Sequence, residues 1–327
     1  MKVYPKYLDV QRSAAPNVTF TFFIQGTKTG IETINFTSTN NSLGFTEVVV
    51  KVVNSIYLED IIFLLKVLSY IIISLSMYPQ LYTIKDIDRL SIYEISGMSN
   101  DFVYLNLLAR ALMLFNTLQM SCLSMEEYRT RYPKGLIPIT GVDNAFAFHG
   151  FIVASILCLQ SNRYPGADKK LSTTAKVIVI FCIIVPNIAY FLEMLGFIQW
   201  LDVIYVHRFE EWLLLFLRYL PQVRHNFRRK CTLGWNIWGP LVELLGLGIS
   251  GVSVLLQIIN LGWIVTPLEN TFVELIIIVF AILYIIIFIV QHFIYYYEPE
   301  IDTTSNKRNS FDSCECEQDK TLYYFAY

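Results

Sequence analysis

The sequence predicts an all-α membrane protein with seven transmembrane helices. Of its 327 residues, 54% are hydrophobic and only 16% are charged, whereas an average soluble domain carries roughly 25% charged residues. The apolar residues gather in runs of about 20, the length that a helix needs to cross a bilayer. The net charge of −2 provides no basic field for nucleic acid. This composition excludes a disordered chain, a nucleic-acid binder and a typical soluble enzyme.

Seven apolar segments define the expected spans. They lie near residues 59–80, 99–121, 144–161, 174–197, 200–222, 236–259 and 271–296. The last is almost uninterrupted, whereas the first, second and fifth contain internal polar residues. Basic residues cluster in alternate loops, those after the first, third and fifth spans. Because basic loops stay on the cytosolic side, we expect a luminal N-terminus and a cytosolic C-terminus.

The two ends of the chain differ from the spans. Residues 1–58 are polar and contain three glycosylation sequons, at Asn17, Asn35 and Asn40, which fits a luminal, glycosylated segment. They contain no cysteine, so no disulfide framework is expected there. Residues 298–327 form an acidic tail, expected to be disordered and cytosolic.

An internal repeat links the first and fifth spans. Both end in a Pro-Gln pair, Pro79-Gln80 and Pro221-Gln222, 142 residues apart. This spacing predicts two parallel three-helix bundles, 59–161 and 200–297, joined by a linking helix within 162–199. A proline removes one backbone donor and weakens the turn before it. The two pairs therefore predict a pair of polar hinges.

Four stretches, in order, resemble the PQ-loop transporters. They are Asp101-Phe102-Val103-Tyr104-Leu105-Asn106-Leu107; Tyr132-Pro133-Lys134-Gly135 with Asp143-Asn144 and His149; Tyr219 to Gln222 with Asn226 and Glu243; and Val290-Gln291-His292-Phe293. Together they are similar to the branch that exports cystine from lysosomes with protons. The chain departs from that branch at four positions. Gly239 stands where Asn is usual, Glu243 and Ile285 stand where Asp is usual, and Glu211 stands where Lys is usual.

Glu243 is the first candidate for a proton site. Seven polar or small residues recur at helical spacing on one face of the sixth span: Asn236, Gly239, Glu243, Gly246, Ser250, Ser253 and Gln257. Close helix packing explains the glycines and serines, but it does not explain a carboxylate in mid-face. An ionisable group at membrane depth is by default a functional-site hypothesis.

Other polar residues of the spans have two possible roles. Asp101 and Asp143 could cap helices, while the resemblance implies that they and His149 act as proton or gate residues. Arg110 needs a counter-charge from another helix, and Glu193 is a candidate. The remaining polar positions are expected to line the hinges and contact substrate: Tyr78, Pro79, Gln80, Asn106, Tyr219, Pro221, Gln222, Asn226 and Asn236.

The resemblance implies proton-coupled export of cystine, or a related amino acid, from a lysosome or vacuole to the cytosol by alternating access. No nucleophile or metal-ligand spacing indicates an enzyme, and protons are the only expected coupling species. Two alternatives remain open. One is a PQ-loop transporter of cationic amino acids, for which Glu211 would be suited. The other is a seven-helix sorting or cargo receptor without transport.

Overall fold

The computed structural model describes residues 2–4, 23–25, 29–36, 46–87, 97–122, 124–132, 139–163, 170–230, 232, 235–264 and 270–296. The expected glycosylation sites Asn17 and Asn40 and the tail at 298–327 lie outside the described residues, whereas Asn35 lies in a strand.

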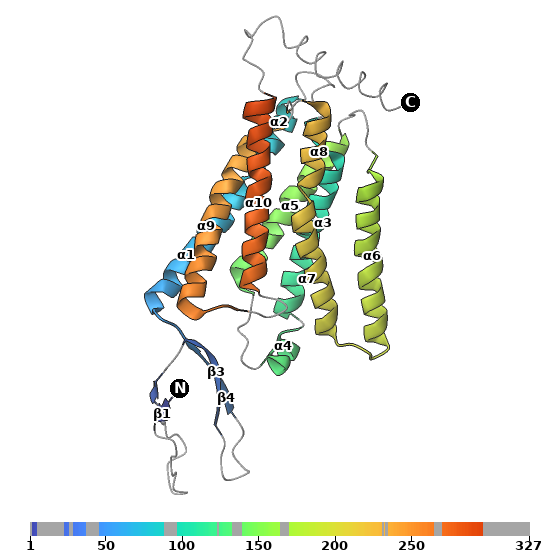
Figure 1. The fold of residues 1–327 in the computed structure, drawn as a ribbon. Coiled ribbons are helices and arrows are strands. Elements are labelled where there is room, and N and C mark those ends of the chain that lie inside the picture. Colours follow the sequence, from blue (N-terminus) through green and yellow to red (C-terminus); the bar gives the residue numbers. More distant parts are fainter. Residues whose placement is uncertain are drawn as a thin grey trace, which may run out of the picture.

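Within these residues, seven long helices run side by side (Figure 1). They are α1 (Ile56–Leu75), α3 (Asn100–Cys122), α5 (Gly141–Arg163), α6 (Thr173–Met194), α7 (Trp200–Leu217), α9 (Trp238–Leu261) and α10 (Thr271–Val290). Three short helices and one π-helical turn accompany them: α2 (Tyr78–Ile87), α4 (Met125–Arg131), α8 (Leu220–Arg229) and η2 (Gln291–Tyr295).

The prediction of an α-helical membrane protein is confirmed, but the count of seven spans is not settled by composition. Among the described residues, five helical segments are long and apolar enough to cross a membrane. A sixth requires α3 and α4 together, which are bent by 74°. The remaining long helix, α7, carries Asp202, Arg208, Glu210 and Glu211 within 18 residues. These charges lower its hydropathy, and two of them, Glu210 and Glu211, are buried in the protein interior.

The N-terminal segment differs from the all-α expectation. It contains two antiparallel hairpins, one formed by β1 (Lys2–Tyr4) and β2 (Phe23–Gln25), the other by β3 (Gly30–Phe36) and β4 (Thr46–Val52). β4 is rich in valine, a residue that favours strands. The hairpins and α4 lie at one end of the helical body, here called the β-strand end, and α2 and α8 lie at the opposite, α8 end (Figure 1).

Six of the long helices enclose the interior. α5 packs on both α1 and α3, and α10 packs on both α7 and α9. The two sets meet where α1 packs along α9 and α3 packs along α7. α6 packs on the outer side of α7, away from α1 and α9 (Figure 1). The interior is therefore bounded by residues from six helices that are distant in sequence.

Each Pro-Gln pair lies in the first turn of a short helix that follows a long one, and by composition Pro79-Gln80 still falls near the end of a candidate span, Ile56–Thr83. α1 stops at Leu75 and α7 at Leu217, and after one irregular turn the chain continues as α2 and α8. Pro79 and Pro221 each occupy the second position of the new helix. Proline is tolerated in the first turn, where no N–H partner is needed. The irregular turn precedes the proline, where the i−4 carbonyl has lost its donor.

The polar face of α9 divides into two stripes. Gly239, Gly246 and Ser253 turn toward α1, because a Cβ at Gly246 would lie 2.6 Å from Ile73 Cγ1 and the Ser253 hydroxyl donates to the Ile62 carbonyl at 3.1 Å. Glu243, Ser250 and Gln257 line the interior cavity described below. Close helix packing therefore explains Gly239 and Gly246, Ser253 both packs on α1 and borders the cavity, and the proton-site role of Glu243 stays a prediction.

Replacing Gly246 by Ala is expected to lower the free energy of unfolding by about 1–3 kcal/mol, because the new methyl group would overlap Ile73. Thermal unfolding in detergent measures the change. Gly248→Ala is the matched control, since its Cβ meets no heavy atom within 4 Å. Equal stability of the two variants would show that α1 and α9 do not approach closely at Gly246.

Candidate functional site

A cavity of about 220 Å³ lies between the six enclosing helices, and every one of them contributes to its lining. Its lining contains four basic and four acidic residues. They are Lys66, Arg110, Arg208 and Arg218, and Asp143, Glu211, Glu243 and Glu274. The formal charge of the lining is therefore zero. Such a concentration of ionisable groups at membrane depth is costly, which makes this cavity the candidate functional site.

Glu243 lies at the inner end of the cavity, buried with Arg218 and Tyr219. Arg218 Nη2 donates to Glu243 Oε1 at 2.9 Å, and the Tyr219 hydroxyl donates a short hydrogen bond to the same oxygen. Arg218 also donates to Asn106 Oδ1 at 3.2 Å. Glu243 is thus bound to the two residues that form the irregular turn between α7 and α8.

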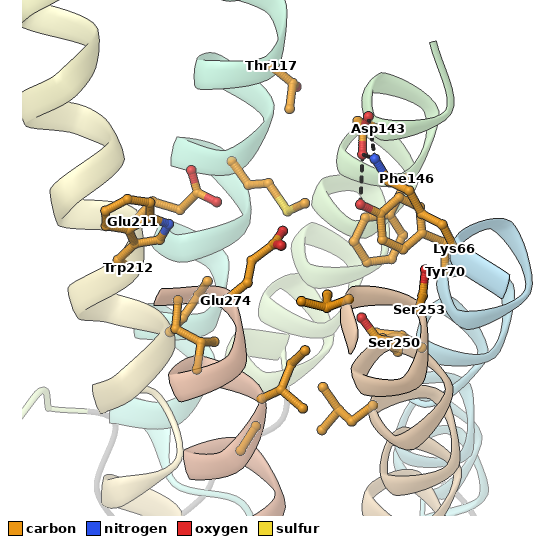
Figure 2. A pocket seen from close by; sticks show the side chains of 18 of the residues that line it. Lys66, Tyr70, Thr117, Asp143, Phe146, Glu211, Trp212, Ser250, Ser253 and Glu274 are labelled. Atoms are coloured by element: carbon orange, nitrogen blue, oxygen red, sulfur yellow. Dashed lines mark hydrogen bonds and ion pairs between the residues drawn. The ribbon is translucent and has the colours of Figure 1, made fainter. Parts of the chain in front are cut away.

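Asp143 occupies the other end of the cavity, where it both caps a helix and pairs with a cation. Its Oδ2 accepts from the Thr140 N–H at 2.8 Å, at the start of α5. Its Oδ1 accepts from the Tyr70 hydroxyl at 2.7 Å and lies 2.9 Å from Lys66 Nζ. Figure 2 shows Lys66 and Tyr70 of α1 meeting Asp143 in this way. Capping and a charged role are therefore compatible.

A third ion pair lies on the α7 wall. Arg208 Nη1 donates to both oxygens of Glu211 at 2.9 Å, and Asn116 of α3 donates to Glu211 Oε2 at 2.7 Å. Glu274 of α10 extends its carboxylate into the cavity (Figure 2). Glu211, the extra acid that would suit a cationic substrate, is therefore already paired with Arg208.

The cavity is closed toward the α8 end. Arg110, Arg218 and Glu243 are buried, whereas Lys66, with a side chain 32% exposed, and the partly exposed Arg208, Gln257 and Glu274 lie toward the β-strand end. Beyond Glu243 lie four packed aromatic rings, those of Phe102, Tyr219, Trp235 and Phe288. We call these four rings the aromatic plug. Tyr219 belongs both to the plug and to the Glu243 cluster.

Arg110 and its expected partner lie apart. Arg110 lines the cavity, with its guanidinium 5.4 Å from the centre of the Phe146 ring. Glu193 is absent from the cavity lining, because α6 packs on the outer side of α7. The proposed Arg110–Glu193 pair is wrong, and the acids that act on Arg110 electrostatically are Glu243 and Glu211.

Two further expected proton residues lie outside this cavity. His149 Nε2 pairs with the Tyr78 hydroxyl at 2.9 Å, between α5 and α2. Asp101, in the first turn of α3, accepts from the Ser172 N–H at 2.9 Å and borders a separate cavity near α8. In this conformation neither is part of the Glu243 or Asp143 clusters.

The two Pro-Gln glutamines make reciprocal contacts across the molecule. Gln80 Oε1 accepts from the Asn236 N–H at 2.8 Å, just before α9, and Gln222 Oε1 accepts from the Ser99 N–H at 2.8 Å, just before α3. Asn226 is buried between Gln222 and Gln291. These amides therefore hold loop backbone in place and do not line the central cavity.

Sequence reasoning missed Lys66, Arg208 and Arg218 as site residues. Each is a charged residue inside or beside an expected span, which is the signal that singled out Glu243. Their partners, however, come from other helices, so the sequence alone does not indicate which of them face the interior.

Comparison with known proteins places the chain in a family. Residues 213–263 match the model of the PQ loop repeat. The chain is 30% identical to the cystinosin homolog of Dictyostelium discoideum over 230 residues, 69% of this chain and 78% of that one. It is 30% identical to the cystinosin homolog of Arabidopsis thaliana over 234 residues, 70% and 83% of the two chains. The chain belongs to the cystinosin family.

Other members of the family are longer. Cystinosin of Drosophila melanogaster is 28% identical over 236 residues, 71% of this chain but only 58% of that protein. Of the two expected repeats, the match to the PQ-loop model covers the second, which contains Arg218, Pro221 and Glu243.

Proposed function

We propose that this chain transports cystine, coupled to protons, from the lumen of a lysosome or vacuole to the cytosol. The observation that carries the proposal is the central cavity, whose four basic and four acidic residues balance and whose inner end is closed at Glu243. Cystine carries two ammonium and two carboxylate groups, so a cavity with both signs and no net charge suits it. Membership of the cystinosin family supports the same substrate.

The balance of charge disfavours the alternative of a cationic amino acid. A cation would be favoured by an excess of acids. Asp143, Glu211 and Glu243 are instead each paired with Lys66, Arg208 or Arg218. A sorting receptor, the other alternative, would not require a charged cavity at membrane depth.

Glu243 would couple proton binding to movement. When it is charged, it holds Arg218 and Tyr219 at the turn between α7 and α8. Protonation would remove the ion pair and convert the carboxyl group from a pure acceptor into a donor. The turn and the Tyr219 ring of the aromatic plug would then be released together. In this scheme the β-strand end faces the lumen, and loss of the plug opens the path to the cytosol.

The experiment uses purified protein in proteoliposomes. Labelled cystine should enter in response to a pH gradient and should carry a proton current. Uptake of labelled lysine or arginine in place of cystine would show that the substrate is a cationic amino acid. Binding without uptake or current would favour the receptor.

Orientation has its own prediction. Because β3 lies at the β-strand end, Asn35 should be glycosylated and a tag after Tyr327 should be cut by protease added to intact vesicles. In Asn35→Gln, the decrease in apparent mass caused by endoglycosidase should be smaller by one glycan. A protected tag would reverse the orientation.

Pro221→Ala is expected to slow transport without unfolding the protein. The new N–H at position 221 can donate to the Leu217 carbonyl and make the turn before α8 regular. Transport rate per folded molecule is the measurement. Pro186→Ala is the matched control, since Pro186 lies inside α6, on the outer side of α7. An unchanged transport rate in Pro221→Ala would show that the proline only terminates α7 and does not act as a hinge.

A further inference from the structure

Three of the four cations in the cavity are already neutralised. Lys66 lies 2.9 Å from Asp143, Arg208 lies 2.9 Å from Glu211, and Arg218 lies 2.9 Å from Glu243. Each pair joins one basic and one acidic group of the lining. One cation, Arg110, and one acid, Glu274, are therefore left over among the eight charged residues of the cavity.

Arg110 is a buried cation without an anion in contact. Its residue is only 5% exposed, and among the described residues no carboxylate oxygen lies within 4 Å of its guanidinium. Its one hydrogen-bond contact is to Met113 Sδ at 4.0 Å, a weak acceptor, and its Nε has no partner in the described structure. An unpaired charge in such a place is destabilising, which calls for a function.

The position of Arg110 is fixed by its surroundings. Phe146 lies under the guanidinium at 5.4 Å, and the α5 backbone approaches so closely that a Cβ at Gly150 would lie 3.3 Å from Arg110 Cδ. A planar guanidinium held in this way presents its N–H groups to a carboxylate in a defined geometry.

Glu274 supplies the opposite charge. It stands in the first turn of α10, and its carboxylate points into the same cavity (Figure 2). In the described part of the chain it has no ion pair within 4 Å, although Arg208 and Lys66 act on it electrostatically. Arg110 lies on α3, in the half of the ring formed by α1, α3 and α5. Glu274 lies on α10, in the half formed by α7, α9 and α10.

We propose that Arg110 and Glu274 are recognition groups for the substrate, Arg110 binding a carboxylate at the inner end of the cavity and Glu274 binding an ammonium group nearer the β-strand end. The proposal rests on the proposed function for the identity of the substrate, but it requires only a zwitterionic amino acid. Binding neutralises both leftover charges at once. It also joins the two halves of the ring through the solute.

The test compares ligands that lack one kind of group. Binding of cystine, of cystamine, which lacks both carboxylates, and of 3,3′-dithiodipropionate, which lacks both amines, is measured on the purified full-length protein. Lysine is a fourth probe. Arg110→Met should weaken cystine binding roughly 10- to 100-fold, the value of a charged hydrogen bond, while leaving cystamine binding unchanged. Glu274→Gln should weaken cystine by a similar factor while leaving dithiodipropionate unchanged.

Stability provides a second readout. Because Arg110 has no anion to leave behind, Arg110→Met should unfold at the same temperature as the wild type or higher, while cystine binding is weakened. Arg110→Lys should retain part of the affinity. Arg129→Met, at an exposed arginine of α4, is the control and should change neither property.

The outcomes separate this inference from the proposed function. Wild-type binding of lysine and not cystine, with the same losses in both variants, would overturn cystine transport and support the inference. Wild-type cystine affinity in Arg110→Met or Glu274→Gln would overturn the inference alone. Equal loss of all four ligands in both variants, or a large fall in unfolding temperature for Arg110→Met, would indicate a structural role and also overturn it. Failure of the wild type to bind any amino acid would overturn both.

Discussion

Replacing Glu243 by Gln is expected to abolish cystine transport driven by a pH gradient while leaving substrate binding and cystine exchange in place. The Gln side chain keeps the shape and the hydrogen-bonding capacity of a protonated carboxyl group, but it carries no charge to pair with Arg218 and no longer titrates. The variant therefore resembles a permanently protonated carrier. Net uptake and counterflow exchange, measured in the same proteoliposomes across a range of pH, separate the two activities.

Glu243→Asp is the paired variant. It keeps titration and restores the residue usual in the resembling transporters, so it should retain substantial pH-driven uptake. If Glu243 only holds Arg218 by hydrogen bonding, Gln should be the milder change and Asp, shorter by one methylene, the more harmful one. An active Gln variant with an inactive Asp variant would remove Glu243 from the coupling step.

Arg218→Met should have the largest effect on stability. It would leave the buried Glu243 without its cation, and breaking a buried ion pair by removing one partner costs about 3–5 kcal/mol. The double variant Arg218→Met, Glu243→Gln removes both charges and should recover most of this loss, but it should not recover pH-driven transport. The unfolding temperature of each variant measures its stability, and uptake into proteoliposomes measures its pH-driven transport.

Arg129→Met is again a suitable control, because an exposed substitution of the same kind should change stability by no more than about 0.5 kcal/mol. Wild-type stability of the single Arg218→Met variant would contradict the ion pair. So would a double variant no more stable than the single one, since the penalty would then lie in lost packing of the long side chain.

The sequence alone determined the class of this protein and the position of its buried acid. Apolar runs of this length indicate membrane helices, because a chain that crosses the bilayer core must satisfy its backbone hydrogen bonds internally. The spacing of Gly239, Glu243 and Gly246 placed them on one face of α9. The paired Pro-Gln motifs, together with the matching stretches, identified the family. All of these signals are local, or repeat at a fixed interval.

The tertiary structure decided which residues meet. Periodicity shows that Glu243 and Gly246 share a face, but not that one faces the cavity and the other faces Ile73 of α1. The partners Lys66 and Asp143, 77 positions apart, are brought together only by the packing of α1 on α5. Likewise, Glu193 was excluded as a partner of Arg110 by the outer position of α6. Contacts between helices depend on their order and rotation in the bundle, which are properties of the packed molecule and not of any one segment.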